Sequence, residues 1–368
     1  MSPNDRHPVV LARRRGSRIS DRPADRATVS VIIPCYNYAR FLPAAIDSAL
    51  GQRDADMRVI VVDDASTDDS AVVARAAAAR DPRVLVIVHE ANQGPVATFN
   101  DGLAVATGDY LIRLDADDVL TPGSVARSTA LAEEFPNVSM VYGHPVHFSG
   151  TTLPSYRDKA VSWTVWSGPS WLELRCRRGV NCITSPEVLM RAAVVREVGG
   201  QRDLAHTHDM EMWFRLALHG DVGWINGADQ AWHREHDDSL SAREVDVLTD
   251  LEERARAFEV LFSNAGGSRP ENERLRVLAR NALANEAVAR AAQAYSRGRG
   301  GTPEVDRYER YAAALCPVPA DLPHSTVLAR ARKLGPRQAV YSPYLFARAV
   351  VYRGTRELRA LRWRATGL

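Results

Sequence analysis

The sequence predicts an α/β fold in which a mostly parallel sheet is covered by helices and is followed by an α-helical C-terminal region. Two observations carry this prediction. Near-continuous apolar runs alternate with segments of helical spacing over the first third of the chain, and only helical spacing remains beyond residue 241. Strands that are apolar along their whole length are typical of parallel sheets with both faces covered. We therefore expect a disordered tail at residues 1–28, an α/β domain at residues 29–241 and a helical region at residues 242–368.

Three strand-then-helix units are expected at the start of the α/β domain. The first strand, Val29–Pro34, is rich in β-branched residues, ends at a proline and precedes apolar residues at helical spacing. The next strands are expected at Arg58–Asp63 and Val84–Val88, and their helices at Ser70–Arg80 and Val96–Ala106. Right-handed crossovers would bring the carboxyl ends of these strands to one edge of the sheet, where α/β proteins bind ligands.

A carboxylate cluster follows a fourth apolar run, Tyr110–Leu114. Asp115, Asp117 and Asp118 come directly after it, where a strand ends and a loop begins. Carboxylate oxygens at such an edge can hold a hard divalent cation against a substrate diphosphate. The cluster therefore predicts an enzyme that acts on a diphosphate-bearing substrate.

A second acidic pair, Asp63 and Asp64, lies at the end of the second strand. The later Asp68 and Ser70 are placed to cap the next helix, but the pair comes before the cap. A carboxylate at the strand tip can accept hydrogen bonds from a nucleobase or a ribose. No G-x-G-x-x-G follows any strand, so the sequence disfavours a nicotinamide enzyme.

Composition excludes several other classes of protein. The chain of 368 residues has 47 basic and 45 acidic residues, and a net charge of +2 argues against nucleic-acid binding. No apolar stretch approaches the length of a membrane span, and the N-terminus lacks the apolar core of a secretory signal. The four cysteines are too sparse for a disulfide framework, so we expect a reducing, cytoplasmic location.

Five motifs together closely resemble the family 2 glycosyltransferases, which have the GT-A fold. They are, in chain order, residues 29–37, 62–68, 92–94, 108–110 and 114–118. Each motif alone is weak, but their order and spacing over about 90 residues make coincidence improbable. The likeness continues through residues 191–200, 208–217 and 233–241. The resemblance therefore covers the whole of the expected α/β domain.

The resemblance implies a metal-dependent, inverting transferase that moves a sugar from a nucleotide-diphosphate sugar, with UDP the expected nucleotide. The residues expected to bind the nucleotide are Pro34, Tyr36, Asn37, Asp64, Asn92 and Asp115, with Asp64 meeting the base and Asp115 facing the ribose. Asp117 would bind Mn²⁺ or Mg²⁺, and His236 would close on the same metal or on the diphosphate. Asp209 falls where the family places its catalytic base.

One position departs from the family pattern. Many relatives carry an Arg-Asn pair in the helix after the Asn-x-Gly motif, and this chain has Phe99-Asn100. The missing arginine leaves the choice of nucleotide base open, and it does not touch the metal site.

Asp209 opens a segment with apolar residues at helical spacing, so its carboxylate is expected in the first turn of a helix. The helix dipole favours an ionised carboxylate there, although an aspartate at this position can also simply cap the helix. A single base opposite the leaving group gives inversion at the anomeric carbon. Glu211 lies roughly 200° further round the helix and is expected at the surface or on the acceptor side.

Other histidines and aromatic residues carry weaker signals. His206, His208, His233 and His236 form two closely spaced pairs, but no cysteine pair accompanies them and zinc is disfavoured. We interpret His206 and His208 as polar residues of an acceptor loop, and His233 as a packed or solvated strand residue. Trp163, Trp166 and Trp171 lie in a segment, residues 151–180, that we expect to be irregular and to recognise the acceptor. These indoles can stack on sugar rings or pack in the core.

The helical region is expected to contain helices at Arg243–Phe262, Glu271–Tyr295 and Pro303–Leu315. Such a region can form a homo-oligomer, bind an acceptor carrier or brace the catalytic domain. The last segment, Tyr344–Trp363, mixes apolar residues with arginines, a pattern that fits peripheral contact with an anionic membrane surface. A solvated helix packed on its neighbours is the alternative.

Two further functions stay open at this stage. A catalytically silent nucleotide-sugar-binding module would keep the fold without activity, but it has no need for acids at Asp64, Asp117 and Asp209. A nucleotidyltransferase would carry a loop rich in glycine and arginine after the first strand, where this chain has residues 35–38, Cys-Tyr-Asn-Tyr. The sequence does not fix the acceptor, which could be a lipid carrier, a polysaccharide, a peptide or a small metabolite.

Overall fold

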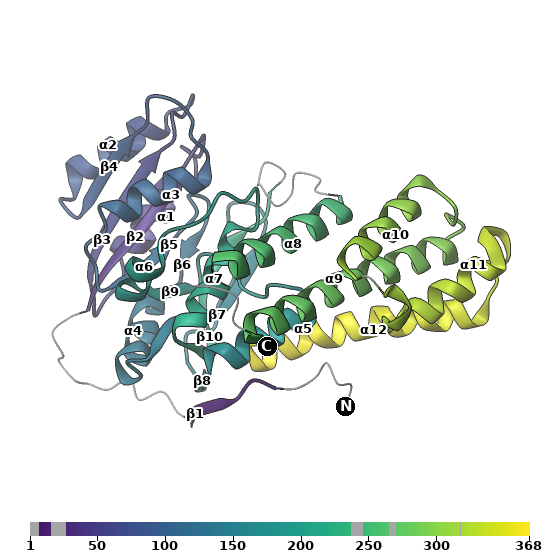
Figure 1. The fold of residues 1–368 in the computed structure, drawn as a ribbon. Coiled ribbons are helices and arrows are strands. Elements are labelled where there is room, and N and C mark those ends of the chain that lie inside the picture. Colours follow the sequence, from purple (N-terminus) through teal and green to yellow (C-terminus); the bar gives the residue numbers. More distant parts are fainter. Residues whose placement is uncertain (1–6, 16–26, 237–245, 265–269, 317) are drawn as a thin grey trace.

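The computed structural model describes residues 7–15, 27–236, 246–264, 270–316 and 318–368 (Figure 1). The strands are β1 Val10–Arg15, β2 Thr28–Cys35, β3 Asp56–Asp63, β4 Val84–Val88, β5 Tyr110–Arg113, β6 Val119–Leu120, β7 Val138–Phe148, β8 Ser162–Trp166, β9 Val188–Arg191 and β10 Asp221–Arg234. The helices of the α/β part are α1 Leu42–Leu50, α2 Ser70–Arg80, α3 Pro95–Ala104, α4 Ser124–Glu134, α5 Gly168–Arg178, α6 Ala192–Val198 and α7 His208–His219. The helices that follow are α8 Val247–Asn264, α9 Pro270–Ser296, α10 Pro303–Leu315, α11 Ser325–Ala339 and α12 Pro343–Thr366, with a short 3₁₀ turn at Pro319–Asp321.

The strands form one sheet in the order β1-β8-β10-β7-β9-β5-β2-β3-β4, with β6 paired to β10. The strand-then-helix units are confirmed, because β5, β2, β3 and β4 are parallel neighbours. The sheet as a whole is mixed rather than mostly parallel. The strand β9 lies antiparallel between β5 and β7, and β8 lies antiparallel between β1 and β10.

Alternate side chains of β2 and β3 point to opposite faces of the sheet, as the period of a strand requires. Ile32 and Ile60 pack on the face covered by α3, whereas Val31 and Val59 pack on the face covered by α1 and α2. All four are at most 3% exposed. Burial on both faces explains why these strands read as continuous apolar runs.

Part of the expected disordered tail is ordered. Val10–Arg15 forms β1, which pairs antiparallel with β8 at the edge of the sheet. The backbone N–H of Val9 also donates to Ser170 Oγ of α5 at 2.8 Å. The prediction is therefore wrong for these residues, because edge pairing with a strand more than 140 positions away supplies the hydrogen bonds that the local sequence does not. Residues 1–6 and 16–26 lie outside the described residues.

The segment at residues 151–180, expected to be irregular, contains β8 and α5. Trp163 and Trp166 belong to β8 and Trp171 to α5, and each is at most 6% exposed. Trp166 stacks on Trp224 with ring centroids 6.0 Å apart. The three indoles therefore pack in the core and are not available to stack on a sugar.

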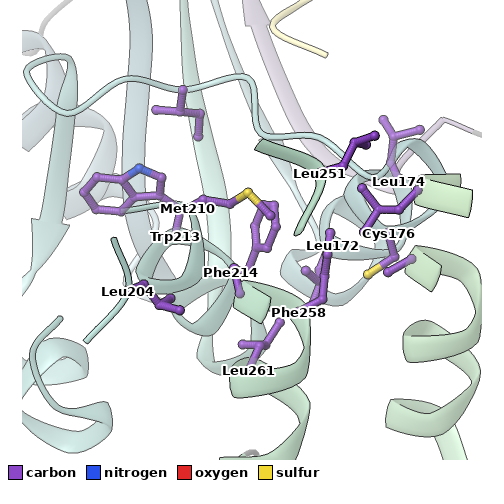
Figure 2. Packing of buried hydrophobic residues seen from close by; sticks show 14 of the residues in the cluster. Leu172, Leu174, Cys176, Leu204, Met210, Trp213, Phe214, Leu251, Phe258 and Leu261 are labelled. Carbon is purple, nitrogen blue, oxygen red and sulfur yellow. The ribbon is translucent and has the colours of Figure 1, made fainter. Parts of the chain in front are cut away.

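The C-terminal helices share a continuous core with the α/β part. Figure 2 shows Met210, Trp213 and Phe214 of α7 packed near Phe258 and Leu261 of α8, with α5 beside them. The rings of Phe214 and Phe258 stack with centroids 5.2 Å apart. The three predicted helices correspond to α8, α9 and α10, and α11 has no counterpart in the predictions. Because α8 packs on α7, the helical region contacts the α/β part directly.

Candidate active site

The loops that follow β2 and β3 are tied together by Asn37. Asn37 has a φ of 62° and its side-chain oxygen accepts from the backbone N–H of Thr67 at 2.8 Å. In return, the backbone N–H of Asn37 donates to Ser66 Oγ at 3.0 Å. Beside it, Pro34 is half-buried in β2 and Tyr36 is 44% exposed. The predicted nucleotide residues of the first loop therefore lie at the tips of the parallel strands.

Asp64 anchors the loop that carries the Asn-x-Gly motif. Its Oδ1 accepts from the backbone N–H of Gln93 at 2.8 Å, and its Oδ2 accepts from the backbone N–H of Gly94 at 2.9 Å. His89 Nδ1 lies 2.8 Å from the same carboxylate, and Asn92 Nδ2 donates to the Asp64 carbonyl at 3.3 Å. Asp64 is 3% exposed, and the contacts of its carboxylate with Gln93, Gly94 and His89 take most of the acceptor capacity of that group. His89 was not predicted, although a histidine at the end of the third strand was the available signal.

Asp117 and His236 meet at the edge of the sheet. His236 Nε2 lies 2.8 Å from Asp117 Oδ2, across 119 positions of the chain. The His236 ring is held by Tyr38 and Phe41, with ring centroids 5.8 and 5.5 Å away. Its Nδ1 is buried without a hydrogen-bond partner. The two residues predicted as metal ligands are therefore in contact.

This pair fits part of a divalent-cation site. One carboxylate and one imidazole are suitable ligands for Mn²⁺, and the Nε2 of His236 is the nitrogen that faces the Asp117 carboxylate. Within the described ranges, no three His, Cys, Asp or Glu side chains gather closely enough to hold an ion by themselves. A substrate diphosphate and water can supply further ligands. Residues 237–241 of the last predicted motif lie outside the described residues.

Asp118 has a structural role beside the metal pair. It is fully buried, and its Oδ1 accepts from the backbone N–H of Arg234 at 2.8 Å. Its Oδ2 lies 3.0 Å from His233 Nδ1. Burial opposes the charged form of His233, but the hydrogen bond to Asp118 outweighs it and raises the pKa of His233 to about 9. Asp118 therefore fixes the end of β10, and His233 is a packed strand residue.

Asp209 lies in the first turn of α7 and faces other side chains. Arg113 Nη1 donates to Asp209 Oδ1 at 2.5 Å, and Ser185 Oγ and Gln201 Nε2 also donate to its carboxylate. No side chain caps this end of α7, so the carboxylate does not serve as a helix cap. Burial disfavours the ionised form of Asp209, but Arg113 outweighs it and lowers the pKa.

Arg113 of β5 joins Asp209 to Asp115. Its Nη2 lies 3.0 Å from Asp115 Oδ1, so one guanidinium contacts both carboxylates. Burial and the neighbouring carboxylates raise the pKa of Asp115, while Arg113 opposes the rise. Arg113 is 4% exposed, and sequence reasoning missed it because it reads as part of an apolar strand.

The departure at Phe99-Asn100 is explained by packing. Phe99 is fully buried, with the Arg113 guanidinium 5.9 Å from its ring centroid. Asn100 exchanges two hydrogen bonds with the backbone of Gln201, at 2.8 and 2.9 Å, and Gln201 in turn donates to Asp209. Phe99 therefore packs on Arg113 and Asn100 holds Gln201, and both of these partners contact Asp209.

Two expectations about the helix of Asp209 are wrong. Glu211, expected at the surface or on the acceptor side, has a side chain that is 0% exposed, because Arg215 one turn later pairs with it at 2.9 Å. His208, expected in an acceptor loop, is 4% exposed and lies 3.0 Å from Arg113 Nη1. Burial lowers the pKa of His208, which favours the neutral ring.

Comparison with known proteins covers the N-terminal part of this site. Residues 30–198 match the model of glycosyl transferase family 2, which spans the loops of Asn37 and Asp64 and the cluster at Asp115 and Asp117. The matched residues make up a little under half of the chain, and over them the chain is similar to glycosyl transferase family 2. The names of the family and of its relatives indicate a glycosyltransferase.

Two curated relatives illustrate the extent of the likeness. An uncharacterised glycosyltransferase, alr2836, of Nostoc sp. (strain PCC 7120) is 44% identical over 145 residues, which cover 39% of this chain and 43% of that protein. The putative glycosyltransferase EpsE of Bacillus subtilis is 29% identical over 57% of this chain and 73% of its own length. The chain thus spans less than half of the Nostoc relative.

Solved structures of GT-A type glycosyltransferases share the fold. S. aureus TarS 1-349 in complex with UDP-GlcNAc has a TM-score of 0.51 at 16% identity, covering 78% of this chain and 91% of that chain. The mannosyltransferase PcManGT from Pyrobaculum calidifontis, in complex with GDP-Man and Mn²⁺, has a TM-score of 0.50 at 18% identity, covering 86% and 91%. The chain has the GT-A fold, followed by a helical C-terminal region.

Proposed function

We propose that this protein is a metal-dependent, inverting glycosyltransferase that uses a nucleotide-diphosphate sugar, with UDP as the nucleotide. The observation that carries the proposal is the link from Asp115 through Arg113 to Asp209, with the Asp117–His236 contact at the same edge of the sheet. TarS was solved with UDP-GlcNAc and PcManGT with GDP-Man and Mn²⁺, which supports a nucleotide-sugar donor.

Asp117 and His236 would hold the cation. A bound Mn²⁺ or Mg²⁺ would supply positive charge that stabilises the departing diphosphate. Arg234 supports this site, because its Nε donates to the Asp117 carbonyl at 2.9 Å and its guanidinium lies between the rings of Phe41 and Phe148. Arg234 thereby holds the backbone of Asp117, the residue that carries the proposed metal-binding carboxylate.

Asp209 would act as the general base. Arg113 keeps its carboxylate ionised at neutral pH, and an ionised carboxylate can take the proton of the attacking acceptor. The same guanidinium fixes Asp209 relative to Asp115, the residue assigned to the ribose. One base on the face opposite the leaving group gives inversion of the anomeric carbon.

The nucleotide would lie over the loops after β2, β3 and β4. Pro34, Tyr36, Asn37 and Asn92 would line its pocket. Asp64 is assigned to the base, although most of its carboxylate already holds the loop at Gln93 and Gly94. We assign it there through the one acceptor position that these contacts leave open.

The four cysteines are free, which supports the proposal of a reducing, cytoplasmic location.

A screen of nucleotide sugars for donor hydrolysis, with and without Mn²⁺, tests the function. Asp209→Asn should abolish turnover and leave donor affinity nearly unchanged, whereas Asp117→Ala should weaken metal-dependent donor binding itself. Turnover by Asp209→Asn at the wild-type rate would exclude Asp209 as the base. Donor binding that is indifferent to chelators would exclude the metal role of Asp117. Donor binding without any turnover across the screen and across acceptors would instead favour the silent binding module.

A further inference from the structure

The last helix, α12, is exposed along nearly its whole length. Of its 24 residues only Leu345 is buried. Five large apolar side chains of α12 are between 52% and 69% exposed: Phe346, Val350, Val351, Leu358 and Leu361. Exposed apolar residues that occur singly need no explanation, but a group on one helix marks a surface that contacts something.

Four of these side chains, all except Phe346, fall on one face of α12. At 100° per residue, Ala347, Val350, Gly354, Leu358, Leu361 and Ala365 recur every three or four positions and align along the helix. Val351 lies at the far edge of the same arc. No charged residue falls within this arc, which is about 100° wide. We call these seven residues the α12 stripe.

Arginines border the α12 stripe on both sides. On one side Glu357 lies next to the stripe, and Arg364 and Arg353 come after it; on the other side Arg362 lies next to the stripe, and Arg348 and Arg359 come after it. The helix carries six arginines against a single glutamate, Glu357. The α12 stripe is therefore an apolar band between two cationic rows.

The α12 stripe faces away from the protein. The opposite side of α12 instead lines a cavity of about 580 Å³ shared with α9, and its α12 residues are Phe346, Ala349, Tyr352, Arg353, Arg356, Glu357 and Ala360. In Figure 1, α12 (yellow) runs beside α9 and α11 along one side of the helical region. Since α9 lies on the opposite side of the helix, the described chain leaves the α12 stripe uncovered.

The N-terminal segment next to α12 has the same character. His7 contacts Arg362 near the C-terminal end of α12. Val9, Val10 and Leu11 are 58%, 44% and 54% exposed, and three consecutive arginines follow at residues 13–15. Apolar residues beside arginines therefore recur on two segments that touch.

We propose that the α12 stripe, extended by β1, lies on an anionic lipid bilayer, with the apolar side chains at the acyl boundary and the bordering arginines at the headgroups. A helix with an apolar face and arginine-rich borders binds in the plane of such an interface. Each arginine near an anionic surface adds to the attraction. A second copy of the chain fits this surface less well, because two-fold pairing of α12 stripes would bring cationic rows together.

Co-sedimentation of the full chain with vesicles tests the proposal. Wild type should pellet with phosphatidylcholine vesicles that contain about one third phosphatidylglycerol, and much less with phosphatidylcholine alone. Leu358→Ser with Leu361→Ser should lower the partition coefficient about tenfold, because two exposed leucines no longer enter the interface. Arg359→Gln with Arg364→Gln should also lower it about tenfold, and added salt should lower wild-type binding.

Matched controls lie on α2 of the α/β domain. Val72→Ser removes a side chain that is 63% exposed, and Arg75→Gln with Arg80→Gln removes two exposed arginines. Neither control should change vesicle binding. Helical circular dichroism and donor hydrolysis in solution should match wild type in every variant, so a failure of the membrane proposal is separate from a failure of the proposed function.

Three results would overturn the proposal. The first is wild-type protein that stays in solution with anionic vesicles. The second is wild-type binding by the Leu358→Ser, Leu361→Ser variant. The third is a wild-type dimer in sedimentation equilibrium that ignores vesicles and that this variant converts to a monomer, which would identify a second copy as the occupant.

Discussion

Arg113 holds Asp209 through a 2.5 Å contact between its Nη1 and the carboxylate, across 96 positions of the chain. Its other terminal nitrogen contacts Asp115 at 3.0 Å. A planar guanidinium can serve two carboxylates at once with fixed geometry, which a lysine ammonium cannot. Arg113 is therefore a positioning residue that sets the proposed base relative to the proposed ribose site.

Arg113→Lys should keep the buried charge and lose the double contact. We expect kcat for sugar transfer to fall about tenfold to a hundredfold, because the base is no longer held in place. A weaker contact raises the pKa of Asp209, so the acid limb of the kcat profile should move to higher pH. Steady-state kinetics over a pH series measure both effects.

The control for this variant is Arg127→Lys. Arg127 is also 4% exposed, but it bonds Gln230 at 2.9 Å and the Asp229 carbonyl at 3.0 Å, away from the proposed base. It should lower stability without moving the pH profile. An unchanged kcat and pH profile in Arg113→Lys would show that Arg113 does not position the base.

His236→Ala should change the metal preference of donor binding. An imidazole favours Mn²⁺ over Mg²⁺, so its loss should weaken Mn²⁺-dependent donor affinity about tenfold and lessen the preference for Mn²⁺. Calorimetric titration with the nucleotide diphosphate at a series of Mn²⁺ and Mg²⁺ concentrations measures this. His147→Ala is the control, because the side chain of His147 is 44% exposed and its described contacts are with Glu235 at 3.0 Å and with the His233 ring, whose centroid is 5.2 Å away. An equal loss of donor affinity with both cations would assign His236 to the diphosphate. No loss with either cation would show that His236 binds neither the metal nor the diphosphate.

Local patterns predicted the strands β2 to β5 and the acids at their tips. The reason is that a strand buried on both faces must be apolar throughout, and its end is marked by the first polar residues. Asp117 and His236, predicted to lie together, are in contact, and their metal-binding role stays a prediction. Local pattern is sufficient here because each motif lies next to the strand that positions it.

The features that were missed depend on pairing between distant segments. Arg113 reads as an exception in an apolar strand until its partner Asp209 is placed beside it. β1 was missed because its residues are mostly exposed and carry no buried apolar pattern. It becomes recognisable as a strand only through its pairing with β8 at the edge of the sheet. Glu211 reads as a surface acid because periodicity alone does not reveal the loop that covers it.

Glu173→Gln should weaken the junction between α5 and α9 in a pH-dependent way. Arg274 pairs with Glu173 at 2.6 Å, and this hydrogen bond lowers the pKa of Glu173 to about 2 from an ordinary 4.5. A depressed carboxyl pKa contributes stability that is complete above about pH 4.5 and is lost as the pH falls towards 2. We expect a loss of about 1 kcal/mol at pH 7, in view of partial exposure, and a smaller difference from wild type below pH 4.5.

Urea unfolding at pH 7 and at pH 3 measures this difference. Glu271→Gln is the control, because Glu271 pairs with the same Arg274 at 2.7 Å but is 65% exposed. It should change stability little at either pH. A loss that is equal at both pH values would assign the effect of Glu173→Gln to packing rather than to its charge.

Glu211→Ala should destabilise the protein far more than its place in a polar-looking motif indicates. The Glu211 carboxylate is fully buried and holds Arg215 through contacts at 2.9 and 3.0 Å. Arg215 in turn donates to the carbonyls of Val198, Gly199 and Gly200, at 2.6 to 2.7 Å, in the loop that leads to Gln201. Removing the acid leaves a buried guanidinium without its counter-charge, which costs about 3 kcal/mol.

Thermal unfolding should therefore show a midpoint lower by about 5 to 10 °C for Glu211→Ala. Glu197→Ala on α6 provides the control, because the side chain of Glu197 is 70% exposed and pairs with His219 only at 3.6 Å. That variant should unfold within about 1 °C of wild type, since exposed pairs contribute little. Since the Arg215 loop carries Gln201 to Asp209, Glu211→Ala should also lower kcat below the unfolding temperature. If Glu211→Ala had the same unfolding midpoint as wild type, the Glu211–Arg215 pair would not hold this loop. The contacts that position Asp209 would then have to come from Arg113 and Ser185 alone.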